Sequence, residues 1–394
     1  MSKIIVAVVG LLLFGVLASI GQTNLAIESI EADGSLAFHE VTNATGYRVE
    51  WSTNLALPSW NTSAPTGVVG IPSAGSGTRN VTVDVAQAGC FYRVVATVTN
   101  PLSTPPDMAM IPAGSFVMGN ATNVFPESEG SSDELPQHTV YVSAFFMDVY
   151  EVTKAKWDDV IAYNAGNGYT YSNVGSGKAK NHPVQSVNWY DTVKWCNARS
   201  QCDGLTPVYY TDAGFTTVYK TNEIAPFANW SANGYRLPTE AEWEKAARAG
   251  VADTRFPWTD YTNKISWAKA NYYGHSALYS YDLSGGSGTW DPTFATGLAP
   301  FTSPVGSFAP NSYGLYDMAG NVREWCWDWY DANYYSSSPG TDPRGPAGPL
   351  SGRIARGGAY TSDGANCLRV AKRAIYDPSV GSYIHLGFRC ARGL

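Results

Sequence analysis

Residues 353–369 read RIARGGAYTSDGANCLR, and residues 386–390 near the end of the chain read LGFRC. In the first segment a short alternating run leads into two adjacent glycines, Gly357 and Gly358, and Cys367 follows nine residues later. Adjacent glycines allow a sharp change of direction that other residues resist. We therefore expect a tight turn followed by a strand-like run. Whether Cys367 is reactive or structural decides whether this chain is an enzyme.

The rest of the chain is long enough for two domains and shows no sign of nucleic-acid binding. Its 394 residues exceed what one small core needs. The formal net charge is −7, and no basic run of the kind that binds phosphate backbones is present, so we expect no nucleic-acid partner. The 39 glycines, 23 prolines, 13 tryptophans and 25 tyrosines indicate many turns with aromatic side chains between them.

Residues 1–21 have the pattern of a secretory signal peptide. Lys3 precedes an apolar run over residues 4–18, and small residues at Ser19 and Gly21 suit cleavage after Gly21. An uncleaved membrane anchor is the alternative, although the run is short for a bilayer span. No later stretch is apolar for long enough to span a membrane. We expect a secreted, periplasmic or cell-surface protein with no transmembrane span in the mature chain.

Export would make the cysteines available for disulfide bonds. Their even number permits complete pairing without requiring it, and spacing alone does not determine which cysteines pair. The six are Cys90, Cys196, Cys202, Cys326, Cys367 and Cys390.

Residues 22–100 have the pattern of a small all-β, sandwich-like domain. Period-two alternation separated by turn residues is typical of strands, and it occurs over residues 35–39, 47–51, 81–85 and 91–98. The second and last of these runs resemble the paired central strands of a fibronectin type III-like domain. This domain could be a spacer or adhesion module, or it could simply keep its neighbour soluble. The proline-rich residues 101–107 favour an extended linker.

Residues 108–394 form the second expected domain, with three helices near its start. Thr153 and Asn188 can cap the first two helices. Thr239 opens the third, where Glu242 completes a capping box and Gly250 ends the helix. No helical pattern longer than one turn follows. The remaining aromatic-rich chain must be held by something other than regular ladders, and disulfides or metal ions are the candidates.

Several sequence blocks carry a family resemblance. They are residues 108–119, 182–189, 235–244, 256–258, 311–325, 356–358 and 387–389, and they include YRLPTEAEWE and NSYGLYDMAGNVREW. In this order they resemble the formylglycine-generating enzyme, or sulfatase-modifying factor, family over residues 108–394. The resemblance implies an α+β, complex C-type lectin-like fold with little regular secondary structure and with bound calcium. It implies activity less strongly, since one fold can carry many functions.

The family's oxidases convert a substrate cysteine to formylglycine with copper and oxygen, using two cysteines five residues apart after the glycine pair. Aligned on these glycines, the two positions are Ser362 and Cys367. Two thiolates are soft ligands that suit Cu(I), whereas a serine hydroxyl is a hard, weak donor. Ala359 and Arg323 also depart from the family pattern, at a serine and a tryptophan. We therefore treat Ser362 and Cys367 as doubtful catalytic residues and expect no copper; Cys367 would be buried or disulfide-bonded.

Two structural features are also implied by the resemblance. Cys196 and Cys390 match a pair that is disulfide-bonded in the family. Asp317, Gly320, Val322 and Glu324 match a calcium site, in which two carboxylates and two backbone carbonyls supply the oxygen ligands that calcium prefers. The alternative at that place is an Asx-type turn with Glu324 in a salt bridge.

The function that we predict is an exported sulfatase-modifying-factor-like protein that lacks copper-dependent cysteine oxidation. It would bind a peptide, a glycan or a surface protein through a groove between aromatic loops, because Tyr and Trp give large contact area at low entropy cost. An atypical formylglycine-generating oxidase that matures exported sulfatases is the alternative. A rigid scaffold at the cell surface is a third possibility.

Overall fold

A computed structural model of the chain divides it into two compact units, Met1–Ser103 and Thr104–Leu394. In the second unit the structure describes residues 105–394 except 106, 122–129, 165, 259, 261, 362 and 363. In the first unit it describes only the backbone of six short strands. We describe each unit by itself.

The first unit contains two three-stranded sheets, ordered β1-β6-β4 and β2-β3-β5. The strands are β1 (Ala7–Val8), β2 (Ile27–Ile30), β3 (Ser35–His39), β4 (Ala44–Ser52), β5 (Thr78–Thr82) and β6 (Phe91–Val98). Strands β4 and β6 are antiparallel, with Tyr47 opposite Ala96, so the two segments that we expected to pair do so. Strand β5 begins three residues before the expected run at 81–85. Strand β1 lies inside the expected signal peptide, and the signal peptide and the sandwich stay predictions.

The second unit has three α-helices in its described part, and each begins at the predicted cap. They are α1 (Lys154–Tyr163), α2 (Trp189–Cys202) and α3 (Glu240–Arg248). Side chains of Thr153 and Asn188 accept backbone N–H bonds at the first two N-termini, and α3 has the full capping box. Helix α3 ends at Arg248. Its C-cap Ala249 is left-handed with φ 49°, and the expected stop residue Gly250 follows with a positive φ of 82°.

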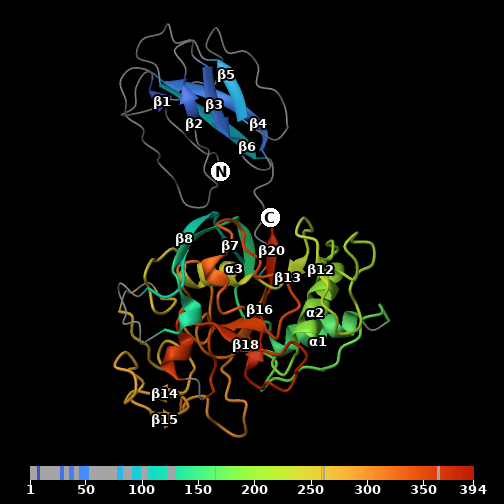
Figure 1. Ribbon diagram of the computed structural model, residues 1–394, viewed down its shortest axis with the longest axis vertical. Helices are drawn as coiled ribbons and strands as arrows, with labels where there is room; N and C mark the ends of the chain where they lie inside the picture. Colours follow the sequence, from blue (N-terminus) through green and yellow to red (C-terminus); the bar gives the residue numbers. More distant parts are fainter. Residues whose placement is uncertain are drawn as a thin grey trace. The chain divides into compact units, whose positions relative to one another are not determined.

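Two four-stranded sheets form the framework of this unit (Figure 1). The antiparallel sheet β13-β20-β10-β7 consists of β7 (Met108–Ile111), β10 (Phe145–Asp148), β13 (Tyr235–Arg236) and β20 (Ala391–Gly393). The mixed sheet β18-β17-β16-β19 consists of β16 (Arg323–Trp329), β17 (Arg353–Arg356), β18 (Ala374–Tyr376) and β19 (Leu386–Gly387). In the second sheet β16 and β19 run parallel, and the other pairs are antiparallel.

Short elements complete the described part of this unit. Two-stranded ribbons are formed by β8 (Gly114–Met118) with β9 (His138–Val142), β11 (Tyr209–Tyr210) with β12 (Phe227–Ala228), and β14 (Gly274–His275) with β15 (Ser287–Thr289). Single 3-10 turns are η2 (Ser132–Glu134), η3 (Tyr334–Ser336) and η4 (Ala365–Leu368). Three helices beside separate and mixed sheets place the domain in the α+β class. The C-type lectin-like assignment stays a prediction.

Helices α1 and α2 lie side by side (Figure 1) and share an aromatic core. The rings of Trp157 and Trp195 stack with centroids 5.8 Å apart, and Phe388 meets both edge-on. All three side chains are buried. This packing attaches the helical layer to the C-terminal segment that carries the GFRC residues.

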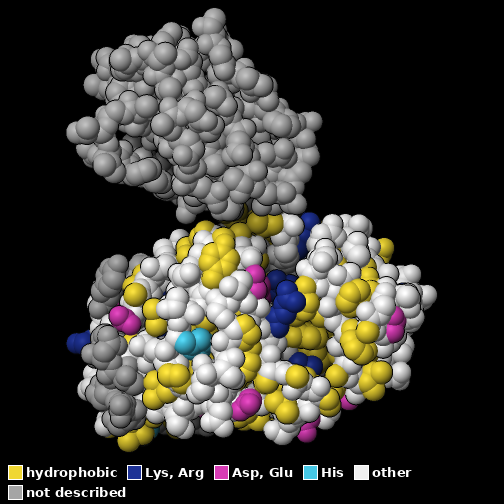
Figure 2. All heavy atoms as spheres, turned by 45° about the horizontal axis from the view of Figure 1, so that its top comes forward, with side chains coloured by type: hydrophobic (Ala, Val, Ile, Leu, Met, Phe, Trp, Pro, Cys, Tyr) yellow, Lys and Arg dark blue, Asp and Glu magenta, His cyan; other side chains and the backbone are white. Residues whose placement is uncertain are grey.

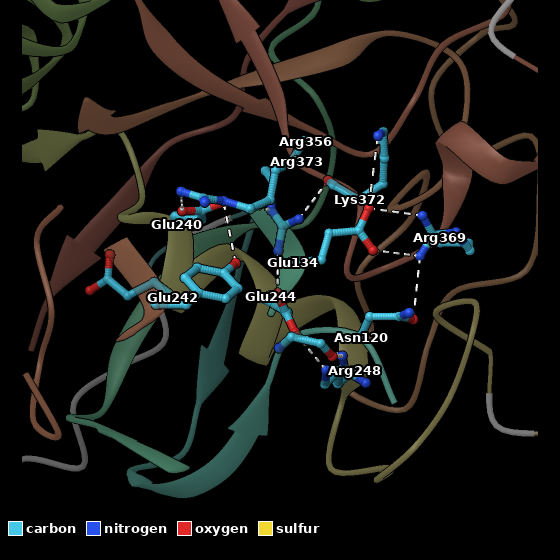
Figure 3. A network of polar contacts seen from close by, with 12 residues as sticks. Asn120, Glu134, Glu240, Glu242, Glu244, Arg248, Arg356, Arg369, Lys372 and Arg373 are labelled. Carbon is cyan, nitrogen blue, oxygen red and sulfur yellow. Dashed lines mark hydrogen bonds and ion pairs between the residues drawn. The ribbon is translucent and has the colours of Figure 1, made fainter. Parts of the chain in front are cut away.

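Buried ion pairs hold the irregular half of the domain to helix α3 (Figure 3). Glu240 binds Arg373 through two bonds of 2.8 and 3.0 Å. One turn later, Glu244 binds Arg248 at 2.7 Å and also pairs with Arg356 of β17. Charges removed from water must be paired to be tolerated, so these contacts fix the loops that follow β17. Arginine–carboxylate pairs take this role among the described residues, and the disulfides and metal ions that we expected here stay predictions.

Candidate functional site

The glycine pair after β17 makes a turn that no other residue type would fit. Gly357 and Gly358 have φ values of 91° and 74°, in the left-handed region that favours glycine. A Cβ on Gly358 would lie 2.9 Å from the carbonyl oxygen of Cys367. The chain beyond the turn bends into η4, so the expectation of a strand-like run after the glycines is wrong. In place of a strand, the glycine turn packs closely against η4.

Cys367 lies in η4 and is half-buried against aromatic residues. Its backbone N–H donates to the Gly364 carbonyl oxygen at 3.2 Å. It packs against a buried cluster that includes Tyr281, with Tyr279 beside it. Burial raises the pKa of Tyr279, and the negative charge that Cys367 can carry adds to this effect. Ser362, the other doubtful catalytic residue, lies outside the described residues.

The arginine near Cys367 is already bound by a carboxylate. Arg369 donates to both oxygens of Glu134, at 2.7 and 2.8 Å, and both side chains are buried. A cysteine becomes reactive when nearby positive charge stabilises its thiolate. Because Glu134 balances the charge of Arg369, this guanidinium stabilises a thiolate at Cys367 less than an unbalanced cation would.

Arg323 and Ala359, the two other residues that depart from the family pattern, are both buried. Arg323 begins β16, and its guanidinium carbon lies 6.0 Å from the ring centre of Tyr376. Its backbone N–H donates to the His385 carbonyl oxygen at 2.8 Å. Ala359 has no exposed surface and presents only a methyl group. These positions therefore carry a cation and a methyl group instead of an indole and a hydroxyl.

An aromatic series leads from the glycine turn to the surface. Tyr360 contacts Phe301 with ring centres 6.3 Å apart, and Phe301 contacts Trp290 at 5.1 Å. Tyr360 is buried, whereas Trp290 is 39% exposed. The series can present apolar surface to a ligand beside the turn.

The predicted calcium residues surround a second tight turn. Asp317 and Gly320 both have positive φ, 56° and 87°. A Cβ on Gly320 would lie 2.4 Å from the Asn271 carbonyl oxygen, so only glycine fits. Behind the turn the backbone N–H of Val322 donates to Glu151 at 3.1 Å. Sequence reasoning missed Glu151, because no spacing pattern links it to the turn.

The carboxylates of Glu151, Asp317 and Glu324 are buried near the guanidinium of Arg389, which pairs with Glu324. Arg389 donates to both oxygens of Glu324, at 2.7 and 2.6 Å, and the Trp243 indole donates to one of them at 2.7 Å. Burial raises the pKa of Asp317 to about 6. Burial and the charges of Asp317 and Glu324 raise the pKa of Glu151 well above its usual range. One guanidinium does not balance three carboxylates, so Glu151 and Asp317 tend to keep their protons, and an added cation would favour their ionised forms.

The donor chemistry of this turn fits calcium through Asp317 better than through Glu324. Oδ1 of Asp317 is buried without a hydrogen-bond partner among the described residues, whereas Oδ2 accepts the Gly306 N–H at 2.7 Å. Both oxygens of Glu324 already accept bonds from Arg389 or Trp243, as the salt-bridge alternative expects. In the described part of the chain no group of three or more His, Cys, Asp or Glu side chains could hold a metal. Calcium would therefore depend on Asp317 and on the carbonyls of Gly320 and Val322.

Cys196 and Cys390 are brought together by α2 and the C-terminal segment. Their sulfur atoms lie 3.6 Å apart, and both residues are fully buried. They are the two cysteines of the predicted disulfide bond. The bond stays a prediction that the close approach of the two sulfurs makes testable.

No helix in the described portion of the chain is both long and apolar enough to cross a membrane.

Comparisons with known proteins agree on the second unit. The sulfatase-modifying factor enzyme 1-like domain family matches residues 95–394. The formylglycine-generating enzyme of Streptomyces coelicolor is 33% identical over 306 residues, which cover 71% of this chain and 87% of that protein. Among solved structures, Treponema denticola variable protein 1 is similar with a TM-score of 0.54 and 29% identity, covering 73% of this chain and 95% of its own. PvdO from Pseudomonas aeruginosa has a TM-score of 0.52 and 26% identity, covering 73% and 94%.

Proposed function

The chain belongs to the sulfatase-modifying factor family, and from this premise we propose that it is an exported ligand-binding member without copper-dependent cysteine oxidation. One observation carries the proposal. Position 362 is a serine, where the family's oxidases have the first of two cysteines. The proposal agrees with a fold whose relatives include both a formylglycine-generating enzyme and a variable protein.

The chemistry of the turn supports this proposal. Cu(I) prefers two soft thiolates, and Cys367 alone supplies one. Cys326 and Cys196 are fully buried, and the sulfur of Cys326 points toward the Glu324 carbonyl oxygen at 3.9 Å. Arg323 and Ala359 remove the indole and hydroxyl that the oxidases have beside the glycine turn.

A binding role needs exposed aromatic surface and does not need copper-dependent cysteine oxidation. The series from Tyr360 through Phe301 to Trp290 offers aromatic surface for a peptide, glycan or surface-protein ligand. A calcium ion held by Asp317 would stiffen the neighbouring turn without taking part in any reaction.

An atypical oxidase is the second candidate, and two observations favour it. Cys367 and Arg369 are retained, and the chain is 33% identical to a formylglycine-generating enzyme. This candidate requires Cys367 to bind copper without the second thiolate ligand that the family's oxidases use.

One assay separates the two candidates. The purified full chain is incubated with a Cys-x-Pro-x-Arg peptide, copper and oxygen, and the peptide is examined by mass spectrometry for conversion of cysteine to formylglycine. We expect no conversion by the wild type or by Cys367→Ser. Conversion by the wild type that disappears in Cys367→Ser would establish the oxidase instead.

A further inference from the structure

We propose that an acidic peptide segment of a partner protein binds to a surface formed by Trp230, Arg236, Trp327 and Arg344, here named the arginine–tryptophan face. The inference rests on the proposed binding role and adds a place and a partner class to it. It does not involve Cys367 or the glycine turn. Figure 2 shows one face of the described unit, on which basic and hydrophobic side chains adjoin, with an acidic side chain beside them.

Arginines and tryptophans alternate in this face. The guanidinium carbons of Arg344 and Arg236 lie 4.3 and 5.1 Å from the Trp230 ring centre. Trp230 meets Trp327 edge-on, with ring centres 5.6 Å apart. Arg344 is exposed and Trp230 is half-buried, so a ligand can reach both. Stacking a guanidinium on an indole fixes its plane and leaves its N–H groups for an acceptor in that plane.

A buried arginine lies beneath the face. Arg353 is 1% exposed, and its guanidinium carbon lies 3.7 and 3.5 Å from the ring centres of Trp189 and Trp329. It also lies 5.1 Å from the ring centre of Trp327 in the face above, and its Nη1 donates to the Trp327 carbonyl oxygen. Among the described residues its Nε has no hydrogen-bond partner and no carboxylate forms an ion pair with it, although the charge of Asp328 acts on it. Aromatic rings and a carbonyl oxygen, rather than a carboxylate, therefore surround its positive charge.

The carboxylates near the face are hydrogen-bonded within the protein, one of them to Arg236 of the face itself. Both oxygens of Glu242 bind Arg236, at 2.6 and 2.7 Å. Asp342 accepts two bonds of 2.7 Å from Ser143. Arg344 forms no ion pair with any described residue, and burial together with the charge of Arg236 lowers its pKa. Glu242 balances the buried Arg236, and Asp342 acts on Arg344 through its charge. The positive charge that the face offers to a ligand is therefore that of the exposed Arg344, on a chain whose net charge is −7.

An acidic peptide fits these features better than other ligands. A guanidinium binds a carboxylate through two parallel hydrogen bonds. Trp and Arg at the centre of a contact surface are the residues that most often dominate protein–protein binding. A nucleic acid is a poorer ligand, because the acidic chain around this small patch would repel its phosphates. Phosphate binding also normally needs several basic residues.

Fluorescence anisotropy of labelled peptides tests the proposal with the full chain. The probe is a fluorescein-labelled Glu-Gly repeat of about ten residues, compared with Gln-Gly and Lys-Gly repeats of the same length. We expect the acidic peptide to bind and the other two to bind at least about tenfold more weakly. Arg344→Gln should weaken acidic-peptide binding by about tenfold, which corresponds to the loss of one charged hydrogen-bond pair. Trp230→Ala should weaken it at least as much.

Lys220→Gln is the matched control, because Lys220 also places a cation 5.0 Å from an aromatic ring, that of Tyr169. It should leave binding unchanged. Circular dichroism confirms that each variant is folded, and Arg344→Lys should keep part of the affinity because the charge remains. Equal binding of all three repeats, an unchanged affinity of Arg344→Gln, or an equal loss in Lys220→Gln would overturn the proposal. None of these results would affect the oxidase assay, so failure here is distinct from failure of the proposed function.

Discussion

Glu244→Gln should destabilise the second unit strongly, because Glu244 is the carboxylate that balances two buried arginines. It accepts bonds from Arg248 Nε at 2.9 Å and Nη2 at 2.7 Å, from the Gly119 N–H at 2.9 Å, and from Arg356. The side chains of the three charged residues are at most 4% exposed. The variant keeps the shape but removes the charge. Arg356 would retain only Glu240 at 3.6 Å as an ionic partner among the described residues.

The cost of breaking such a pair is the cost of an uncompensated buried charge, which is about 3–5 kcal/mol. Urea unfolding followed by tryptophan fluorescence measures it as a lower midpoint at similar slope. Asp158→Asn is the matched control, since it removes the partner of Lys154 in an i,i+4 pair where Asp158 is 52% exposed. We expect less than about 0.5 kcal/mol there. A loss below about 1 kcal/mol in Glu244→Gln would refute the role that we assign to the buried pairs.

Three further predictions concern other parts of the second unit. Burial lowers the pKa of Lys245 to about 8, so between about pH 8 and 10 this residue binds more protons in the unfolded chain than in the folded one. The unfolding free energy of the wild type, relative to that of Lys245→Met, should therefore rise with pH by up to about 1 kcal/mol per pH unit in this range. EDTA should lower the melting temperature of the wild type, and Asp317→Asn should abolish that effect, because calcium stabilises only the folded state. Under oxidising conditions Cys196→Ser should lower the unfolding free energy by about 4 kcal/mol, because a disulfide to Cys390 would close a very long loop; reducing agent should do the same to the wild type.

Each of the three has a result that contradicts it. A flat pH profile for the difference between wild type and Lys245→Met would show that its ammonium is not penalised by burial. An EDTA effect that persists in Asp317→Asn would place calcium elsewhere, and no effect in the wild type would exclude structural calcium. Mass spectrometry that finds free thiols at Cys196 and Cys390 after air oxidation would contradict the disulfide.

Local signals predict the regular elements well. Thr153, Asn188 and Thr239 are caps because their side chains satisfy backbone N–H groups within a few residues, and this information is contained in the neighbouring sequence. Helix α3 ends where Gly250 predicts it to, since Gly250 follows the C-cap Ala249 and both residues have positive φ. The sequence blocks shared with the family suffice to identify the second unit, because they lie in the family's order along residues 108–394.

Long-range contacts do not follow from local sequence signals. Glu134 and Arg369 are separated by 235 residues, and neither has a neighbour that suggests the pair. The same is true of Glu151 behind the calcium turn, at 171 residues from Val322. The sequence after the glycines favours a strand-like run, but contact between the turn and η4 prevents a strand there. Only tertiary packing decides these features.

The most direct test of the account is the fate of a cysteine peptide. The full chain, copper, oxygen and a Cys-x-Pro-x-Arg peptide are incubated together, and the peptide mass is followed over time for wild type, Cys367→Ser and Ser362→Cys. The account predicts that the wild-type reaction leaves the peptide cysteine unchanged, as Cys367→Ser does. Formylglycine formed by the wild type and lost in Cys367→Ser would contradict it.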